Sequence, residues 1–219
     1  DIQERICPIV SGKVKQCIKC EPCAIMEGMA GAGAFSDGKY VISTEYGGWL
    51  TDFLDPRTVI DYIEQADQIL TRHGATTERF LPNNDLKRLC LGHDLHMQQA
   101  QVKHLGTDAN FETMRHLIDS IRDRVEIHTR TEVVDVEKES HTLTARDREG
   151  EHRFTADTIV FAVGRAGSSF FSAWCAENAI PLKNNQVDIG VRVELPSIVW
   201  EHFSKKIYEP KVLYRSKQY

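Results

Sequence analysis

The stretch Gly28-Met-Ala-Gly31-Ala-Gly33-Ala-Phe35-Ser36-Asp37-Gly38-Lys39 decides how we interpret the rest of the chain. Seven of its twelve residues are glycine or alanine, so few side chains stand between the backbone and a ligand. Successive exposed N–H groups in such a segment can bind a phosphate. The stretch therefore predicts a cofactor-binding loop. A tight structural turn is the alternative, because Ser36 occupies the place of the third glycine of a dinucleotide-binding motif.

The composition is that of a globular protein. With 219 residues the chain can bury the core of one large domain or two small ones. A net charge of -5 gives no electrostatic footprint for nucleic acid or an anionic membrane. No apolar run is long enough to cross a bilayer, and no secretory signal stands at the start. We expect a cytoplasmic protein whose partner is a small-molecule substrate, with no nucleic acid and no membrane.

Four cysteines crowd the region before the glycine-rich stretch: Cys7, Cys17, Cys20 and Cys23. In a chain without a secretory signal, such spacing favours metal, cluster or redox chemistry over a disulfide framework. Four thiolates would satisfy tetrahedral zinc or an iron–sulfur cluster. A reactive redox pair, or reduced thiols beside a ligand, are the alternatives. The remaining two, Cys90 and Cys175, fall on apolar helical faces and are expected in the core.

The first half of the chain is predicted to alternate strands and helices. A short strand is expected over 39–44, and Asp55-Pro56 starts a helix that ends near Gly74. The region 78–102 is predicted to be mainly helical. His93 and His96 lie three residues apart within it, either as a surface pair or on a metal-binding face. A strand over 101–104 then leads into a helix at Thr107-Asp108, where an anion site or simple capping is expected.

The period changes from helical to alternating after Val125. Strands are expected over 125–128, 131–138, 142–147 and 152–155, with a hairpin turn at 148–151. The apolar run 158–163 predicts a strand buried on both faces of a parallel sheet. A glycine turn and a helix through Trp174 follow, at the kind of place where open α/β sheets bind ligands. A last strand is expected over 187–194.

These elements predict a mixed α/β (α+β) fold. A β-meander and a mainly helical region are expected within it.

Several blocks together carry a family resemblance: Cys17-x2-Cys20-x-Pro22-Cys23, Gly31-Ala-Gly33-Ala-Phe35-Ser36-Asp37-Gly38-Lys39, His104-x-Gly106-Thr107-Asp108, Val160-Phe-Ala162-Val-Gly164-Arg165 and Asp188-x-Gly190-x-Arg192-x-Glu194. In these blocks the chain resembles the uncharacterised FAD-dependent dehydrogenases of the flavoprotein superfamily with two dinucleotide-binding domains. The resemblance covers nearly the whole chain. It implies part of a Rossmann-like FAD/NAD(P)-binding domain with a β-meander, together with a helical and β substrate domain. Residues 1–50 would carry the cysteine and glycine-rich loops, 51–124 a mainly helical substrate-side region, 125–183 the meander and part of the FAD-binding domain, and 184–219 the first strands of the substrate domain. The resemblance further implies that the family's N-terminal G-x-G-x-x-G unit and its C-terminal FAD-closing segment lie outside this sequence, as missing parts of a longer parent.

The resemblance also implies roles for individual residues. The backbone around Gly31, Gly33, Ser36, Asp37 and Gly38 would approach the flavin and its phosphates. Val133 or Val134 would meet the adenine side by main-chain contact, and Gly164 and Arg165 would lie beside the cofactor. Lys39, His104 and Asp108 are the candidate catalytic residues: a cationic Lys39 would favour the anionic reduced flavin, and a histidine exchanges protons near neutral pH.

The function expected from these features is that of a FAD-dependent oxidoreductase that transfers hydride or electrons, with NAD(P)H as its partner. A cysteine-ligated zinc or iron–sulfur module is the alternative of another class. A third interpretation is a non-catalytic domain that needs the rest of its parent.

Overall fold

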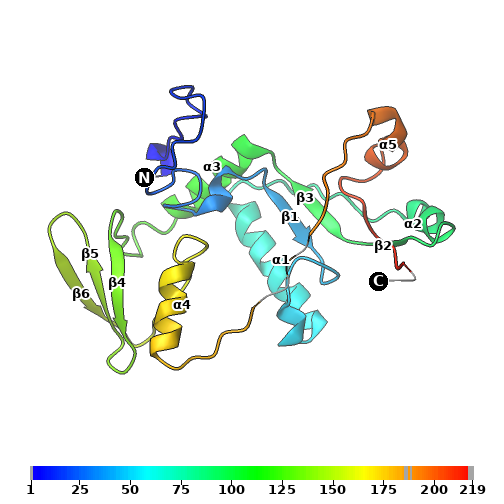
Figure 1. Ribbon diagram of the computed structural model, residues 1–219. Coiled ribbons are helices and arrows are strands. Elements are labelled where there is room, and N and C mark those ends of the chain that lie inside the picture. Colours follow the sequence, from blue (N-terminus) through cyan, green and yellow to red (C-terminus); the bar gives the residue numbers. More distant parts are fainter. Residues whose placement is uncertain (1, 185–186, 188, 217–219) are drawn as a thin grey trace. The chain divides into compact units, whose positions relative to one another are not determined.

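The structure is a computed structural model that describes residues 2–184, 187 and 189–216 (Figure 1). It divides into two compact units. Unit 1 comprises Asp1–Ala34 and Ser120–Ile189, and unit 2 comprises Phe35–Asp119 and Gly190–Tyr219. The fold is mixed α/β, as expected, and is built from small antiparallel sheets and five α-helices within the described residues.

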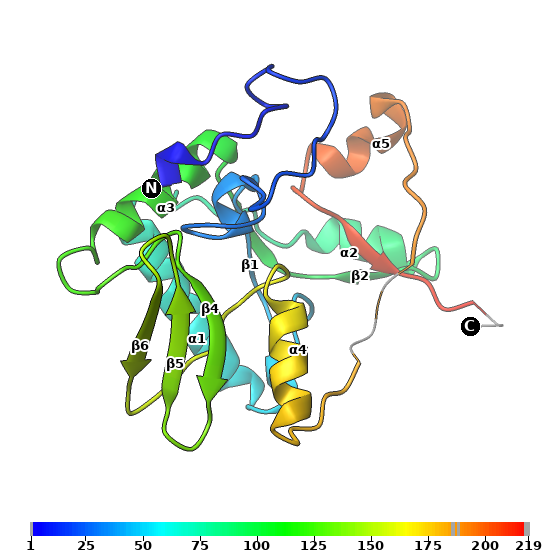
Figure 2. The same ribbon diagram turned by 60° about the vertical axis from the view of Figure 1, so that its left-hand side comes forward.

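Unit 1 contains a three-stranded meander and one helix. The strands β4 (Glu132–Glu137), β5 (Thr142–Arg146) and β6 (Glu151–Thr155) pair antiparallel in the order β4-β5-β6. Helix α4 (Ser168–Glu177) lies beside β4 in both views (Figures 1 and 2). The meander confirms three strands that the alternating pattern predicts.

Local contacts explain this packing. The Asp147 side chain accepts hydrogen bonds from the N–H groups of Glu149 and Gly150, at 2.8 and 3.2 Å, and so closes the hairpin turn. The indole N–H of Trp174 in α4 donates to the Val136 carbonyl in β4 at 2.6 Å. Cys175 is fully buried, as expected of a core cysteine.

Among its described residues, unit 2 contains two antiparallel ribbons and four α-helices. Strand β1 (Lys39–Ile42) pairs with β3 (Gln101–His104), and β2 (His96–Gln98) pairs with β7 (Lys211–Leu213). The helices are α1 (Pro56–Arg72), α2 (Asn84–Leu91), α3 (Thr107–Asp119) and α5 (Ser197–Ser204). Short 3-10 helices occur along the chain at Ile2–Glu4, Ala32–Phe35 and Leu50–Asp52.

The ends of α1 are where the sequence predicts them. Asp55 accepts hydrogen bonds from the N–H groups of Arg57 and Thr58, both at 3.1 Å, and Gly74 follows with a φ of +111°. The helix buries a charged side chain, that of Asp67, which is 6% exposed.

A hydrophobic core in unit 2 joins α2, β2 and α5. Its buried members are Leu86, Cys90, Met97, Phe203 and Ile207. Cys90 is therefore a core residue, as predicted, and the segment that follows α5 is fastened to the rest of the unit through Ile207.

The expected parallel sheet is not present within the described residues, where every strand pairing is antiparallel. Residues 158–163 form no strand, and Val160 is 81% exposed. A strand needs a hydrogen-bonding neighbour, and no described segment supplies one to this run.

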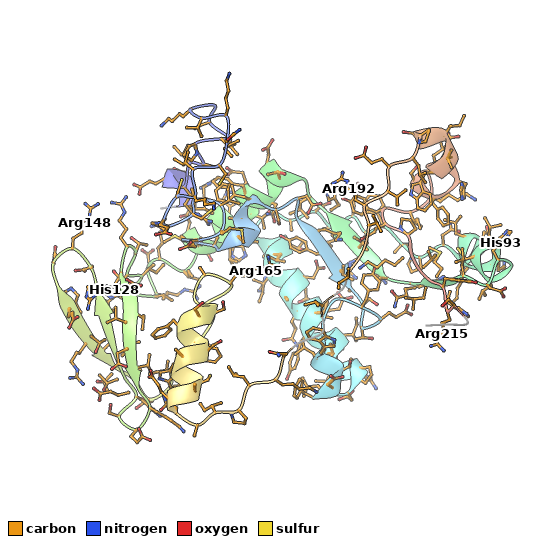
Figure 3. The ribbon with its side chains drawn as sticks, viewed as in Figure 1. His93, His128, Arg148, Arg165, Arg192 and Arg215 are labelled. Carbon is orange, nitrogen blue, oxygen red and sulfur yellow. The ribbon has the colours of Figure 1, made fainter. Side chains whose placement is uncertain are left out.

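The last predicted strand is also wrong over its described part. Residues 189–194 form no strand, and Asp188 lies outside the described residues. Ile189, Val191 and Val193 are 96%, 90% and 72% exposed, and Arg192 extends from this segment (Figure 3). Sequence alternation alone does not provide the partner strand that would bury these side chains.

Two further local predictions are corrected. The region 78–102 is helical only over α2, since β2 and β3 occupy its second half. Residues 125–128 form no strand. None of the described helices is long and apolar enough to cross a membrane.

Candidate functional site

The pairing of β1 with β3 in unit 2 brings together two blocks that the sequence analysis singles out. Lys39 lies directly opposite His104 in the antiparallel register. Beyond the strand ends, the Leu105 N–H donates to the Gly38 carbonyl at 3.1 Å, and the Gly106 N–H donates to the Asp37 carbonyl at 2.9 Å. The backbone hydrogen bonds between β1 and β3 therefore bring Lys39 and His104, which are 65 positions apart in the sequence, to the same edge of unit 2.

A buried asparagine holds the first block in place. Asn110 in α3 is 1% exposed; its amide donates to the Ser36 carbonyl at 3.3 Å, and its oxygen accepts from the Tyr40 hydroxyl at 2.6 Å. Gly38 has a φ of +66°, and a Cβ there would stand 2.8 Å from the Asn110 Cβ. Glycine at this position is thus required by Asn110 and by the backbone conformation, whether or not a ligand binds.

The candidate catalytic lysine is paired with a carboxylate. The ammonium of Lys39 lies 2.8 Å from Glu209 Oε2, and the two side chains are 33% and 30% exposed. The hydrogen bond to Glu209 is the main cause that raises the pKa of Lys39, against the opposing effect of partial burial. Lys39, the first residue of β1, is therefore held as a cation.

The candidate catalytic histidine has an acidic and an aromatic neighbour. His104 Nε2 lies 3.6 Å from Asp37 Oδ2, which is ion-pair range for an imidazolium but too long for a hydrogen bond. The His104 ring stacks on the Tyr208 ring with centroids 4.5 Å apart and planes at 27°. Burial, reinforced by the Asp37 carboxylate, raises the pKa of Tyr208. An ammonium, an imidazole, a carboxylate and a phenol therefore meet at this edge, a set able to bind an anion and exchange a proton.

Asp108, the third candidate catalytic residue, lies in the first turn of α3 and is exposed. Among the described residues no hydrogen bond or ion pair joins it to Lys39 or His104. Contact between Asp108 and a ligand at the start of α3 stays a prediction.

The remaining predicted cofactor residues belong to unit 1. Cβ atoms added at Gly31, Gly33 and Gly164 would meet nothing within 4 Å, so open space borders these backbone positions. Val133 and Val134 lie in β4 at a register irregularity: the ladder passes from Val133 to Asp135, so Val134 is the extra residue of a bulge. Arg165 is exposed at the turn before α4 (Figure 3).

Arg5 organises the segment that follows the cysteine loop. Its guanidinium donates to the carbonyl oxygens of Ala24 (3.0 Å), Ile25 (2.9 Å), Met29 (2.5 Å) and Gly31 (2.8 Å). Burial lowers the pKa of Arg5, and the nearby Cys23 thiol opposes that shift. One side chain thus shapes the start of the glycine-rich stretch.

The four clustered cysteines are free thiols; Cys17 is exposed, and Cys7, Cys20 and Cys23 are half-buried. Within the described ranges, no three His, Cys, Asp or Glu side chains are grouped so as to hold a metal ion. His93 follows α2 (Figure 3) and His96 is in β2, so the pair does not share a helical face. The zinc or iron–sulfur assignment stays a prediction.

Sequence reasoning missed Tyr208, Glu209 and Asn110. Nothing local marks the first two, since their partners lie more than 100 residues earlier in the chain. Asn110 carries a signal that could have been used: it shares a helical face with the buried residues Thr113 and Ile118, and a polar side chain on such a face needs buried partners.

Comparison with protein-family models, with curated proteins and with solved structures finds no match for this chain.

Proposed function

We propose that this chain carries the substrate side, and part of the cofactor side, of a FAD-dependent oxidoreductase that exchanges hydride or electrons, with NAD(P)H as its partner. The observation that supports this most is the β1–β3 register. It sets Lys39 opposite His104, with the Asp37 carboxylate 3.6 Å from the imidazole. These residues come from two of the blocks that carry the family resemblance, and the block Phe35-Ser36-Asp37-Gly38-Lys39 is its most specific part.

The residues present are compatible with FAD. Open space beside the backbone at Gly31, Gly33 and Gly164 suits a ligand bound through main-chain groups. Strand β4 pairs only with β5 among the described residues; Trp174 occupies the Val136 carbonyl, and the bulge at Val134 can offer main-chain groups to an adenine ring. Under this proposal the unit 1 meander and helix α4 are the part of a Rossmann-like FAD-binding domain that the chain supplies. When bound, FAD would supply the two-electron chemistry.

Side chains of this chain would supply the charge, the proton exchange and the substrate contact. Lys39 supplies a fixed positive charge. His104 would exchange a proton with the substrate at Nε2, and the Asp37 carboxylate lies 3.6 Å from that nitrogen. Asp108, exposed at the start of α3, would contact the substrate.

The first test is a visible absorption spectrum of the protein purified without oxygen, both as this chain and with any residues that naturally flank it. Flavin bands are expected in at least the flanked protein. Rapid mixing with NADH should then show flavin reduction or reoxidation slowed about 100-fold in His104→Gln. Lys39→Met should also slow it, whereas Lys206→Met, an exposed lysine elsewhere in unit 2, should not. Absence of FAD from both preparations would overturn the proposal.

A cysteine-based function is the second candidate. It is favoured by four free thiols in one loop, with Cys23 near the Arg5 guanidinium. Metal analysis of the same sample distinguishes the two functions. Stoichiometric zinc or iron without flavin would place the chemistry at Cys7 through Cys23 instead.

A further inference from the structure

Two consecutive residues of unit 2, Tyr208 and Glu209, engage both candidate catalytic side chains. The Glu209 carboxylate lies 2.8 Å from the Lys39 ammonium, and the Tyr208 ring stacks on His104 at 4.5 Å. Because Lys39 and His104 are cross-strand partners, adjacent residues of a third segment can cover both. The groups that a ligand would meet here are already in contact with the chain itself.

The segment that carries these two residues is anchored on either side. Before it, Ile207 is 7% exposed and packs in the core with α2 and α5. After it, Lys211 opens β7, which pairs with β2, and its ammonium lies 4.1 Å from the centre of the Tyr46 ring. The backbone is thus held at both ends, so Tyr208 and Glu209 would uncover more of His104 and Lys39 by rotation of their side chains rather than by movement of the segment.

The space beside these side chains is too small for a substrate. The cavity lined by Tyr46, Phe80, Tyr208 and Glu209 has a volume of about 20 Å³. That is room for about one water molecule, whereas sites for organic ligands have volumes of about 300 Å³ or more. This cavity therefore leaves no room for an organic ligand beside Tyr208 and Glu209 while these side chains cover part of His104 and Lys39.

The charges around the site indicate what such a ligand would carry. Lys39 and Lys211 lie near the carboxylates of Asp37 and Glu209, and the Glu45 carboxylate also acts on Tyr46. Of these carboxylates, that of Glu209 contacts the Lys39 ammonium directly, at 2.8 Å. Without it, Lys39 loses its direct ion-pair partner and keeps only the longer-range attraction of Asp37, so its ammonium can pair with an anion from outside.

We propose that the Glu209 carboxylate occupies a subsite for an anionic ligand group, and that a ligand carrying a carboxylate or phosphate displaces it from Lys39. Tyr208 turns away from His104 in the same event. That this ligand is the oxidoreductase's substrate rests on the proposed function, whereas the anion subsite does not depend on it.

The test is calorimetric titration with benzoate and with benzamide, its neutral counterpart. Glu209→Gln should bind benzoate at least about fivefold more tightly than the unmodified chain, the factor expected from freeing one partly exposed ion pair. Glu201→Gln is the matched control, because it removes an acidic side chain of α5 that pairs with Lys205 and not with Lys39. The benzoate affinity of this control should equal that of the unmodified chain. The double variant Lys39→Met with Glu209→Gln should lose the gain in benzoate affinity. The affinity for benzamide should be the same in all these proteins.

A second measurement follows acetylation of Lys39 by mass spectrometry. Glu209→Gln should accelerate the reaction, and benzoate should slow it again. Equal benzoate affinities for Glu209→Gln and Glu201→Gln, or benzamide binding that matches benzoate binding, would overturn the subsite. If the protein lacks FAD but Glu209→Gln gains benzoate affinity, the subsite stands and the proposed function fails. If FAD binds and Glu209→Gln gains no benzoate affinity, the proposed function stands and the subsite fails.

Discussion

Replacement of Asp67 by asparagine should destabilise unit 2 more than any other single charge removal in its ion-pair network. Asp67 is 6% exposed, and its Oδ1 lies 2.7 Å from the ammonium of Lys103, which is 2% exposed. Its Oδ2 lies 2.8 Å from Arg79. In Asp67→Asn, Arg79 keeps Glu64 at 2.6 Å, but Lys103 loses its counter-ion and keeps only neutral groups, the Thr71 hydroxyl at 3.0 Å and the amide of the new side chain.

The magnitude follows from the burial of the lysine. At 2.7 Å and an effective dielectric constant of 20, the Lys103–Asp67 attraction is about 6 kcal/mol. Desolvation of both charges offsets most of that attraction in the intact pair. Removing one partner leaves the other buried and unpaired, so Asp67→Asn should cost about 3 to 5 kcal/mol. Lys103→Met should cost less, about 2 kcal/mol, because Asp67 retains Arg79.

The assay is urea unfolding with hydrogen exchange read at the amides of α1 and β3, so that unit 2 is observed separately from unit 1. The double variant Asp67→Leu with Lys103→Met should recover much of the lost stability, because an apolar pair has no desolvation cost. Glu112→Gln in α3, which affects an exposed ion pair with Arg115, is the control and should have little effect.

Two results would refute this reasoning. One is a cost below about 1 kcal/mol for Asp67→Asn, the range of an exposed pair. The other is a larger cost for Lys103→Met than for Asp67→Asn, which would mean that Arg79 cannot satisfy Asp67 alone.

Three further outcomes are expected. Gly38→Ala should lower the free energy of unfolding by about 2 kcal/mol or more, since it combines a left-handed φ with the Asn110 contact, whereas Gly33→Ala should be nearly neutral in the same urea titration; equal effects would contradict the packing. The pKa of Asp147 is lowered, chiefly by the hydrogen bond from His152. The ionised Asp147 carboxylate therefore contributes to stability above the ordinary aspartate pKa, and this contribution is lost as the pH falls through the lower pKa of the folded state. NMR of the β5–β6 turn should show this loss, and Asp147→Asn should abolish it. Arg5→Lys cannot make all four carbonyl contacts, so hydrogen exchange after the cysteine loop should accelerate, and unchanged exchange would remove Arg5 from that role.

Local signals in the sequence were sufficient for much of the secondary structure. Asp55 and Pro56 predict the start of α1 because a side-chain cap and a fixed φ act within a single turn. The alternation over residues 131–155 predicts the meander because consecutive strands joined by short turns find their partners nearby. The same patterns placed Lys39 and His104 at strand ends, but could not show that these residues are cross-strand neighbours.

The sequence by itself therefore determined which residue types stand at the candidate site, and the capping and periodicity that form its helices and hairpins. Only the tertiary structure decided which of those side chains meet. Glu209 reaches Lys39 across 170 positions, and Asp67 is buried because Lys103 and Arg79 converge on it. The run 158–163 is apolar enough for a strand but has no described neighbour to pair with. Hydrogen-bond partners and counter-ions come from distant parts of the chain, and local propensity does not encode where those parts will lie.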